Sequence, residues 1–161
     1  MKPWEIWLSH ISTLLVMFSG LAYFWMKYAM ATDDPFSIIN HPWQPAMLSL
    51  HVLVAPVLVF VVGLMVQSHI QKKLKSGESS NRGSGLISIA TLPLMIASGY
   101  MLQVVTSPLL ASIALGIHLV SSSIFVITYV THQLISYWIF IKSDKTRLKN
   151  RPGIFTRKQT A

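Results

Sequence analysis

Residues 83–141 read GSGLISIATLPLMIASGYMLQVVTSPLLASIALGIHLVSSSIFVITYVTHQLISYWIFI, and they contain no Asp, Glu, Lys or Arg. A bilayer core about 30 Å thick takes roughly 20 apolar residues per helix, so these 59 residues are too long for a single membrane span. Thr106, Ser107 and Pro108 supply a break, because proline cannot donate a hydrogen bond to a continuing helix. The stretch therefore predicts two membrane helices.

Two further apolar runs, each about 25 residues long, precede this stretch. Only 11% of the 161 residues are charged, whereas a soluble domain carries about 25%. The predicted fold is all-α: a four-helix transmembrane bundle that forms one integral membrane domain over residues 1–161, with no evident internal repeat. The first run, about 25 residues long, exceeds a signal-peptide core and is expected to remain as a helix. The expected spans cover residues 6–30, 46–70, 86–105 and 109–141.

Basic residues are concentrated between the second and third spans and after the fourth. With four spans, every Lys and Arg except Lys27 lies on one side of the membrane, and the positive-inside rule then places both termini in the cytoplasm. The protein is predicted to span a bacterial inner membrane, where the lipid bilayer is one of its partners. The net charge of +8 does not indicate nucleic-acid binding, because the basic residues stand in short blocks outside the apolar runs. These blocks comprise Lys72, Lys73, Lys75, Arg82, Lys142, Lys145, Arg147, Lys149, Arg151, Arg157 and Lys158.

Histidines inside the spans are the candidate functional residues, because an ionisable side chain is costly in hydrocarbon. The sequence has no Cys, which excludes thiolate metal sites and covalent attachment of heme. His118 and His132 are separated by about 3.9 helical turns, so both are expected on the same side of the fourth span. His51 and His118 both fall in the outer half of the bilayer, within roughly 6 Å of each other in height. We expect these two imidazoles to face one another.

At the inner level, three histidines are candidates for two places. His132 lies about 33 Å below the start of its span, His10 stands a turn inside the cytoplasmic end of the first span, and His69 lies about 27 Å below His51. Paired neutral imidazoles from facing helices are what a six-coordinate heme iron requires. Two such levels predict two heme b groups. One glycine in each span leaves room for the macrocycle, namely Gly20, Gly63, Gly99 and Gly116.

A short four-span core with one histidine on the first helix, one on the second and H-x13-H on the fourth resembles a family of membrane b-type cytochromes. These are the gamma subunit of formate dehydrogenase and the b-type cytochrome of nickel-iron hydrogenase. The matching residues here are His10, His51, His118 and His132. The resemblance implies that His51 pairs with His118 at a periplasmic heme, and that His10, rather than His69, pairs with His132 at a cytoplasmic heme.

The resemblance also implies an electron-transfer subunit of an oxidoreductase complex. Its expected partners are a periplasmic dehydrogenase, hydrogenase or multiheme cytochrome c subunit on one side and a quinone on the other. Quinone would react at the cytoplasmic side. His69 is either a residue of the membrane interface, a hydrogen-bond partner for the quinone or a substitute axial ligand. Residues 33–45, DDPFSIINHPWQP, form either an outer docking surface for the partner or a plain solvated loop.

Two other classes of membrane protein also fit part of the sequence. A histidine-dependent proton or metal-ion transporter without heme would place imidazoles in the bilayer, but such proteins usually use intramembrane Asp or Glu, and none occurs well inside these spans. A structural anchor without a cofactor would explain the length and the charge pattern. It would leave the matched depths of the histidines unexplained.

Overall fold

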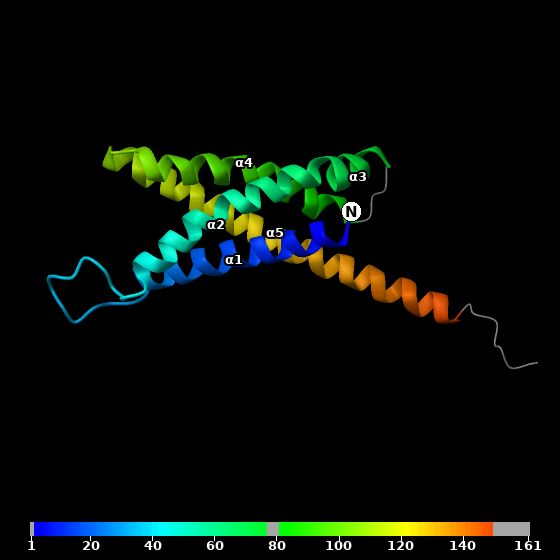
Figure 1. The fold of residues 1–161 in the computed structure, drawn as a ribbon, viewed down its shortest axis with the longest axis horizontal. Coiled ribbons are helices and arrows are strands. Elements are labelled where there is room, and N and C mark those ends of the chain that lie inside the picture. Colours follow the sequence, from blue (N-terminus) through cyan, green and yellow to red (C-terminus); the bar gives the residue numbers. More distant parts are fainter. Residues whose placement is uncertain (1, 77–80, 150–161) are drawn as a thin grey trace, which may run out of the picture. The chain divides into compact units, whose positions relative to one another are not determined.

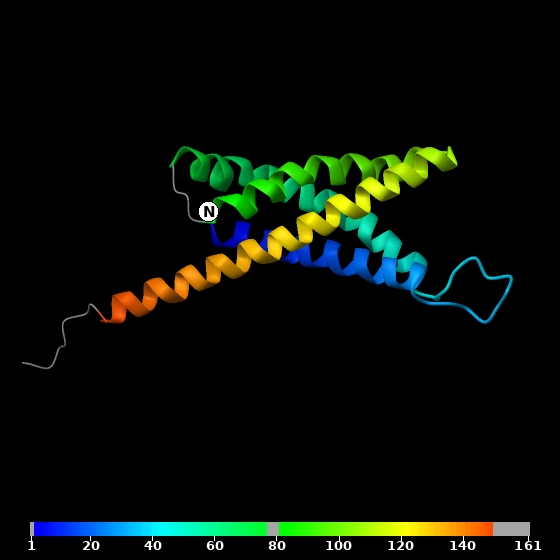
Figure 2. The same cartoon turned by 180° about the vertical axis from the view of Figure 1, so that it is seen from behind.

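The computed structural model describes residues 2–76 and 81–149. Within these residues the secondary structure is helical, without strands. Four helices are long and apolar enough to cross a membrane, which confirms the four predicted spans as helices. The elements are α1 (Pro3–Tyr28), α2 (Gln44–Met65), the π-helical turn η1 (Val66–Ile70), α3 (Gln71–Lys75), α4 (Arg82–Val104) and α5 (Pro108–Lys149), shown in Figures 1 and 2.

The predicted boundaries agree with the helices to within four residues except at two places. The break at residues 105–107 is confirmed, since α4 ends at Val104 and α5 begins at Pro108. The second span is shorter than expected, because α2 ends at Met65 and the chain continues as η1. The last helix is longer than expected and carries Lys142 and Lys145 within α5. Of the basic tail, Arg151, Arg157 and Lys158 lie outside the described residues.

The chain divides into two compact units, residues 1–78 and 79–161. In the first unit, α1 packs against α2, and the connecting loop of residues 29–43 projects beyond the helix ends, coloured cyan in Figures 1 and 2. Asn40 anchors that loop: its side-chain amide donates to Lys27 O at 2.8 Å, and its backbone N–H donates to Gln44 Oε1 at 3.0 Å. In the second unit, α4 packs against α5 across a much shorter connection.

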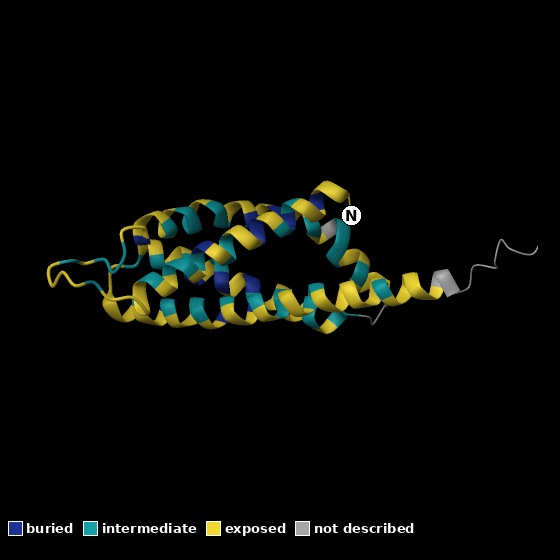
Figure 3. Cartoon of the chain, turned by 90° about the horizontal axis from the view of Figure 1, so that it is seen from below, coloured by how far each residue is buried: buried dark blue, intermediate teal, exposed yellow. Residues whose placement is uncertain are grey.

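In α1 the distribution of polar and apolar side chains is the reverse of that in a water-soluble protein. The buried residues of α1 are all polar: Glu5, Ser9, Ser12, Thr13 and Ser19. Its large apolar side chains face outward; Trp7 and Phe18, for example, are 68% and 65% exposed. Figure 3 shows exposed residues along every long helix. The other long helices bury apolar side chains as well, such as Val61 and Phe125, but they also expose large apolar residues. An apolar exterior suits hydrocarbon as the solvent, so the chain has the character of a multi-pass membrane protein.

The buried hydroxyls satisfy themselves within their own helices. Ser19 Oγ donates to Leu15 O at 2.7 Å, and Ser12 Oγ lies 3.2 Å from Ser9 O. Back-bonding of this kind supplies a partner where no water is present. Among the described residues, no buried side-chain nitrogen or oxygen lacks a hydrogen-bond partner.

Candidate functional site

His51 of α2 is held against α1 by three groups. Its Nδ1 lies 3.0 Å from Val16 O and 3.3 Å from Ser19 Oγ. A backbone carbonyl can only accept, so Nδ1 carries the imidazole proton and donates it to Val16 O. The ring also packs on Gly20, where an added Cβ would stand 2.9 Å from Cε1. Only a glycine at this position lets the two helices approach so closely with the imidazole between them.

His118 of α5 is held against α4 in the same manner. Its Nδ1 lies 3.0 Å from Met95 O and 3.3 Å from Ser98 Oγ. An added Cβ at Gly99 would stand 3.1 Å from Cε1. The proton is again on Nδ1, because its partner is a carbonyl. Each of the two units therefore holds one imidazole with matching groups at nearly identical distances.

His132, further along α5, also contacts α4, which confirms that His118 and His132 face the same neighbouring helix. Its Nδ1 lies 3.1 Å from Ser84 Oγ, and an added Cβ at Gly85 would stand 3.2 Å from Cε1. The Ser84 hydroxyl donates to Asn81 Oδ1 at 2.7 Å. With its single proton given away, Ser84 Oγ accepts from His132, so this imidazole also carries its proton on Nδ1.

One spacing generates all three arrangements, which we call Ser–Gly cradles. Each cradle consists of a residue that supplies a hydrogen-bond acceptor, a serine three residues later and a glycine four residues later. The three positions therefore fall on one face of the helix. Serine Oγ touches Nδ1 in every case, and glycine touches Cε1. The cradles are Val16, Ser19 and Gly20 for His51; Met95, Ser98 and Gly99 for His118; and Asn81, Ser84 and Gly85 for His132.

A proton fixed on Nδ1 leaves the imidazole lone pair on Nε2. Histidines that ligate a metal nearly always donate their other ring N–H to a carbonyl, carboxylate or similar acceptor, which sets the tautomer and the ring orientation. The donor set also consists of imidazole nitrogens, as a bis-histidine heme requires. By this criterion the groups around His51, His118 and His132 fit an axial heme ligand.

The other candidate histidines have different surroundings. His10 is half-buried on α1, and His69 is half-buried within η1. Neither is among the nearest atoms of any described glycine. His41 lies in the loop before α2, where its Nδ1 accepts from Trp43 N–H at 3.1 Å. The cradle thus singles out three of the four histidines predicted as ligands, and the choice between His10 and His69 stays a prediction.

Two of the four glycines predicted to make room for a macrocycle make room for an imidazole, and their role toward a macrocycle stays a prediction. These are Gly20 and Gly99, which touch His51 and His118. An added Cβ at Gly63 or Gly116 would meet nothing within 4 Å. Sequence reasoning missed Gly85 and all three serines of the cradles. The recurring Ser-Gly dipeptide inside an apolar helix was the available signal.

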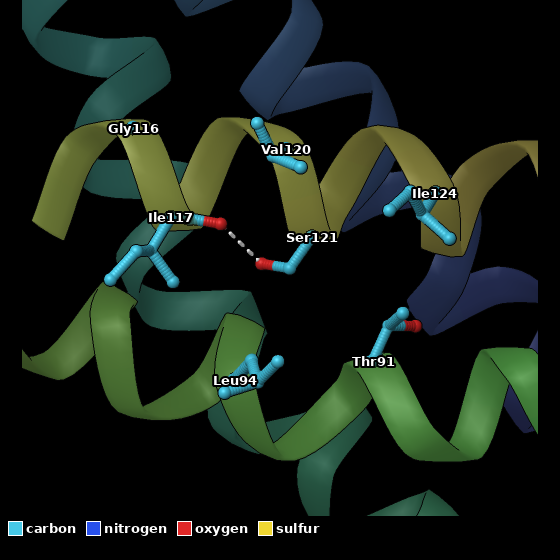
Figure 4. A pocket seen from close by; sticks show the side chains of 7 residues that line it. All are labelled: Thr91, Leu94, Gly116, Ile117, Val120, Ser121 and Ile124. Atoms are coloured by element: carbon cyan, nitrogen blue, oxygen red, sulfur yellow. Dashed lines mark hydrogen bonds between the residues drawn. The ribbon is translucent and has the colours of Figure 1, made fainter.

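An apolar pocket of about 310 Å³ lies between α4 and α5 (Figure 4). The single dashed bond in Figure 4 joins Ser121 Oγ to Ile117 O at 2.7 Å, so this hydroxyl is used within α5. The pocket suits a hydrocarbon group. Its lining residue Gly116 lies two residues before His118 in α5. Its lining comprises Thr91, Leu94, Gly116, Ile117, Val120, Ser121 and Ile124.

His69 occupies an uncommon backbone segment just beyond the candidate span Gln44–Met65. Single π-turns inside helices are rare and occur frequently at functional sites. Burial lowers the pKa of His69 below its usual value of 6.5, and the charge of Lys73 lowers it further. The imidazole is therefore neutral at pH 7 and can accept a hydrogen bond.

These side chains form two kinds of candidate site: three cradled imidazoles on α2 and α5, and a neutral histidine on the π-turn. The first kind has the chemistry of an axial ligand. The second has the chemistry of a hydrogen-bond partner for a polar ligand. No protein-family model matches the chain, and no curated protein or solved structure matches it.

Proposed function

We propose that the chain is a membrane b-type cytochrome subunit, a four-helix bundle with two heme b groups. In this proposal His51 and His118 ligate one heme, and His10 and His132 ligate the other. Each heme, when bound, supplies a one-electron couple between ferric and ferrous iron. The observation that supports the proposal is the set of three cradled imidazoles, each with its proton on Nδ1 and its lone pair on Nε2.

A purely structural role would not call for this set of contacts. A histidine that only links two helices needs one hydrogen bond, made through either ring nitrogen. Here the same nitrogen is used three times, and a glycine each time clears the space beside Cε1. The carbonyl or serine acceptor makes the imidazole more basic, and the glycine contact fixes the direction of its ring.

The remaining parts of the proposal follow from the resemblance and the charge pattern. The subunit would carry electrons between a periplasmic dehydrogenase, hydrogenase or multiheme cytochrome c and the quinone pool, with both termini in the cytoplasm of a bacterium. Quinone reduction or quinol oxidation would take place near the cytoplasmic side. His69 supports a site there, because a neutral imidazole can accept a proton from a quinol hydroxyl.

The direct test is an optical spectrum of the protein purified from heme-replete cells. We expect a coloured protein that contains two noncovalent hemes per chain, with six-coordinate low-spin spectra in both oxidation states. Heme extraction and protein quantification give the ratio. A colourless preparation would end the proposal.

A second experiment asks what His69 does. If it is a quinone partner, His69→Ala should retain both hemes while the rate of heme reduction by a quinol analogue falls at least tenfold, because the proton acceptor is lost. His41→Ala, on the loop before α2, is the matched control. If His69→Ala instead empties one heme site while His10→Ala leaves both filled, then His69 and not His10 is the ligand paired with His132.

One observation favours the alternative, a histidine-dependent proton or metal-ion transporter without heme. Glu5 is only 9% exposed and shares the buried polar face of α1 with Ser9, Ser12 and Thr13. Such a face could line a path for protons. Its carboxylate, however, accepts the backbone N–H of Lys2 at 3.0 Å, which is the contact of a helix cap. The spectrum separates the two functions, since the transporter would be colourless.

A further inference from the structure

The His132 cradle differs from the other two in the atom that finally receives the hydrogen bond. His51 and His118 donate directly to backbone carbonyls of Val16 and Met95, at 3.0 Å in both cases. A backbone carbonyl is present at such a position whichever side chain the residue carries. His132 donates to Ser84, whose hydroxyl donates to the side chain of Asn81. Its acceptor is therefore made entirely of side chains.

The directions of these bonds follow from Asn81. Its Nδ2 lies 2.7 Å from His132 O and 2.8 Å from Ser136 Oγ. Because a backbone carbonyl only accepts, the amide nitrogen must be the atom that faces His132, and Oδ1 must face Ser84. Ser84 then gives its proton to Oδ1 and receives the proton of His132 Nδ1. The chain runs from His132 through Ser84 to Asn81.

The backbone conformation at Asn81 explains why its side chain, and not its carbonyl, is the acceptor in this cradle. Asn81 precedes α4 with φ at 57°, in the left-handed region, which asparagine tolerates better than most residues. It occupies the position that Val16 and Met95 occupy in the other cradles, but it stands outside the helix. Its amide accepts from Ser84 in the first turn of α4 and at the same time donates to His132 O and Ser136 Oγ of α5.

We propose that Asn81 and Ser84 are positioning residues that set the reduction potential of the heme ligated by His132, independently of the other heme. The proposal rests on the proposed heme function. A stronger acceptor for Nδ1–H makes the imidazole a better electron donor to iron, which favours the ferric state and lowers the potential. A weaker acceptor has the opposite effect.

The experiment measures the midpoint potentials of both hemes in the purified full-length protein by spectroscopic redox titration. His132→Ala identifies its own heme by the potential that disappears. Ser84→Ala, which removes the acceptor, should raise that potential and leave the other unchanged. Changes in outer ligand shells commonly alter metal affinity tenfold or more, and a tenfold change in preference between oxidation states corresponds to about 59 mV. Ser84→Thr keeps the hydroxyl and should restore the original value.

Asn81→Asp gives a second and opposite prediction. A carboxylate accepts more strongly from Ser84 than an amide does, so the potential should fall. The change also removes the Nδ2 donor to His132 O and Ser136 Oγ, and the double variant with Ser84→Ala carries the same loss. The carboxylate charge could also act directly through space, and the double variant with Ser84→Ala separates the two causes. If the fall persists undiminished without the Ser84 hydroxyl, the effect does not pass through the relay and the proposal is wrong.

Ser88→Ala is the matched control for packing. Ser88 Oγ lies 2.8 Å from Thr128 Oγ1 and donates to the backbone carbonyl of Ser84 at 3.0 Å, so it also links α4 to α5, about one turn from Ser84, and its removal leaves the Ser84 hydroxyl in place. It should leave both potentials unchanged. If Ser88→Ala shifts the same potential as far as Ser84→Ala does, helix packing is the cause and the relay is overturned. A protein without heme would overturn the proposed function together with the relay, whereas two hemes with unmoved potentials would overturn the relay alone.

Discussion

His51→Ala should reduce the heme content from two groups per chain to one, and His118→Ala should remove the same heme. Six-coordinate iron in this proposal depends on two imidazoles, so the loss of either should release the cofactor or leave a weakly held five-coordinate heme. His10→Ala and His132→Ala should remove the other heme. The remaining midpoint potential in each variant identifies which group was lost.

The control for these variants is again His41→Ala, which lies outside the helices and should keep both hemes. The double variant of His51 and His118 to alanine should retain one heme, because both residues serve a single site. A double variant of His51 and His132 should lose both. If His51→Ala and His118→Ala leave different potentials behind, the two residues serve different hemes and the proposed pairing is wrong.

Adding one methyl group at a cradle glycine should have almost as large an effect. In Gly20→Ala the new Cβ would stand 2.9 Å from His51 Cε1, closer than carbon atoms can approach, so the imidazole must move. The shift is expected to misdirect Nε2 and to empty the same heme site as His51→Ala. Gly99→Ala and Gly85→Ala, at 3.1 and 3.2 Å, should cause graded and smaller losses at His118 and His132.

The chain supplies a matched control for these substitutions. Gly83 is a glycine of α4 where an added Cβ would meet nothing within 4 Å, and unlike Gly63 and Gly116 it is not expected beside a macrocycle. Within a helix, glycine to alanine is favourable by about 1 kcal/mol through backbone conformation alone. Each of these substitutions carries a gain of this kind, so a loss of heme arises from the contact with the ring. Equal heme content in Gly20→Ala and Gly83→Ala would contradict the assigned role of the cradle.

The long helices could be predicted from the sequence because hydrocarbon imposes a length and a composition on any segment that crosses it. Pro108 marked the break between the last two helices for an equally local reason. The π-turn after Met65 could not be predicted, since a change from i+4 to i+5 hydrogen bonding leaves no trace in composition. The fourth helix was predicted to end at residue 141 because Lys142 is the first charged residue after the apolar run.

The histidines were visible as candidate ligands, but what holds them was not. The acceptors for His51 and His118 are backbone carbonyls, which every residue possesses, so no residue type marks them. The glycines were noticed and assigned a different neighbour, because small residues are common in membrane helices for packing alone. No internal repeat is evident in the sequence. The three cradles nevertheless share one spacing, within helices whose other residues differ.

The division into two hairpins has a consequence for biogenesis. The groups that contact Nδ1 of His51 come from residues 16–19, and those that contact Nδ1 of His118 and His132 come from residues 84–98. Each half can therefore finish orienting its own imidazoles as it leaves the translocon, without waiting for the other half to be synthesised. If the proposed function holds, heme insertion would then be a late event that meets imidazoles whose Nδ1 contacts are already made.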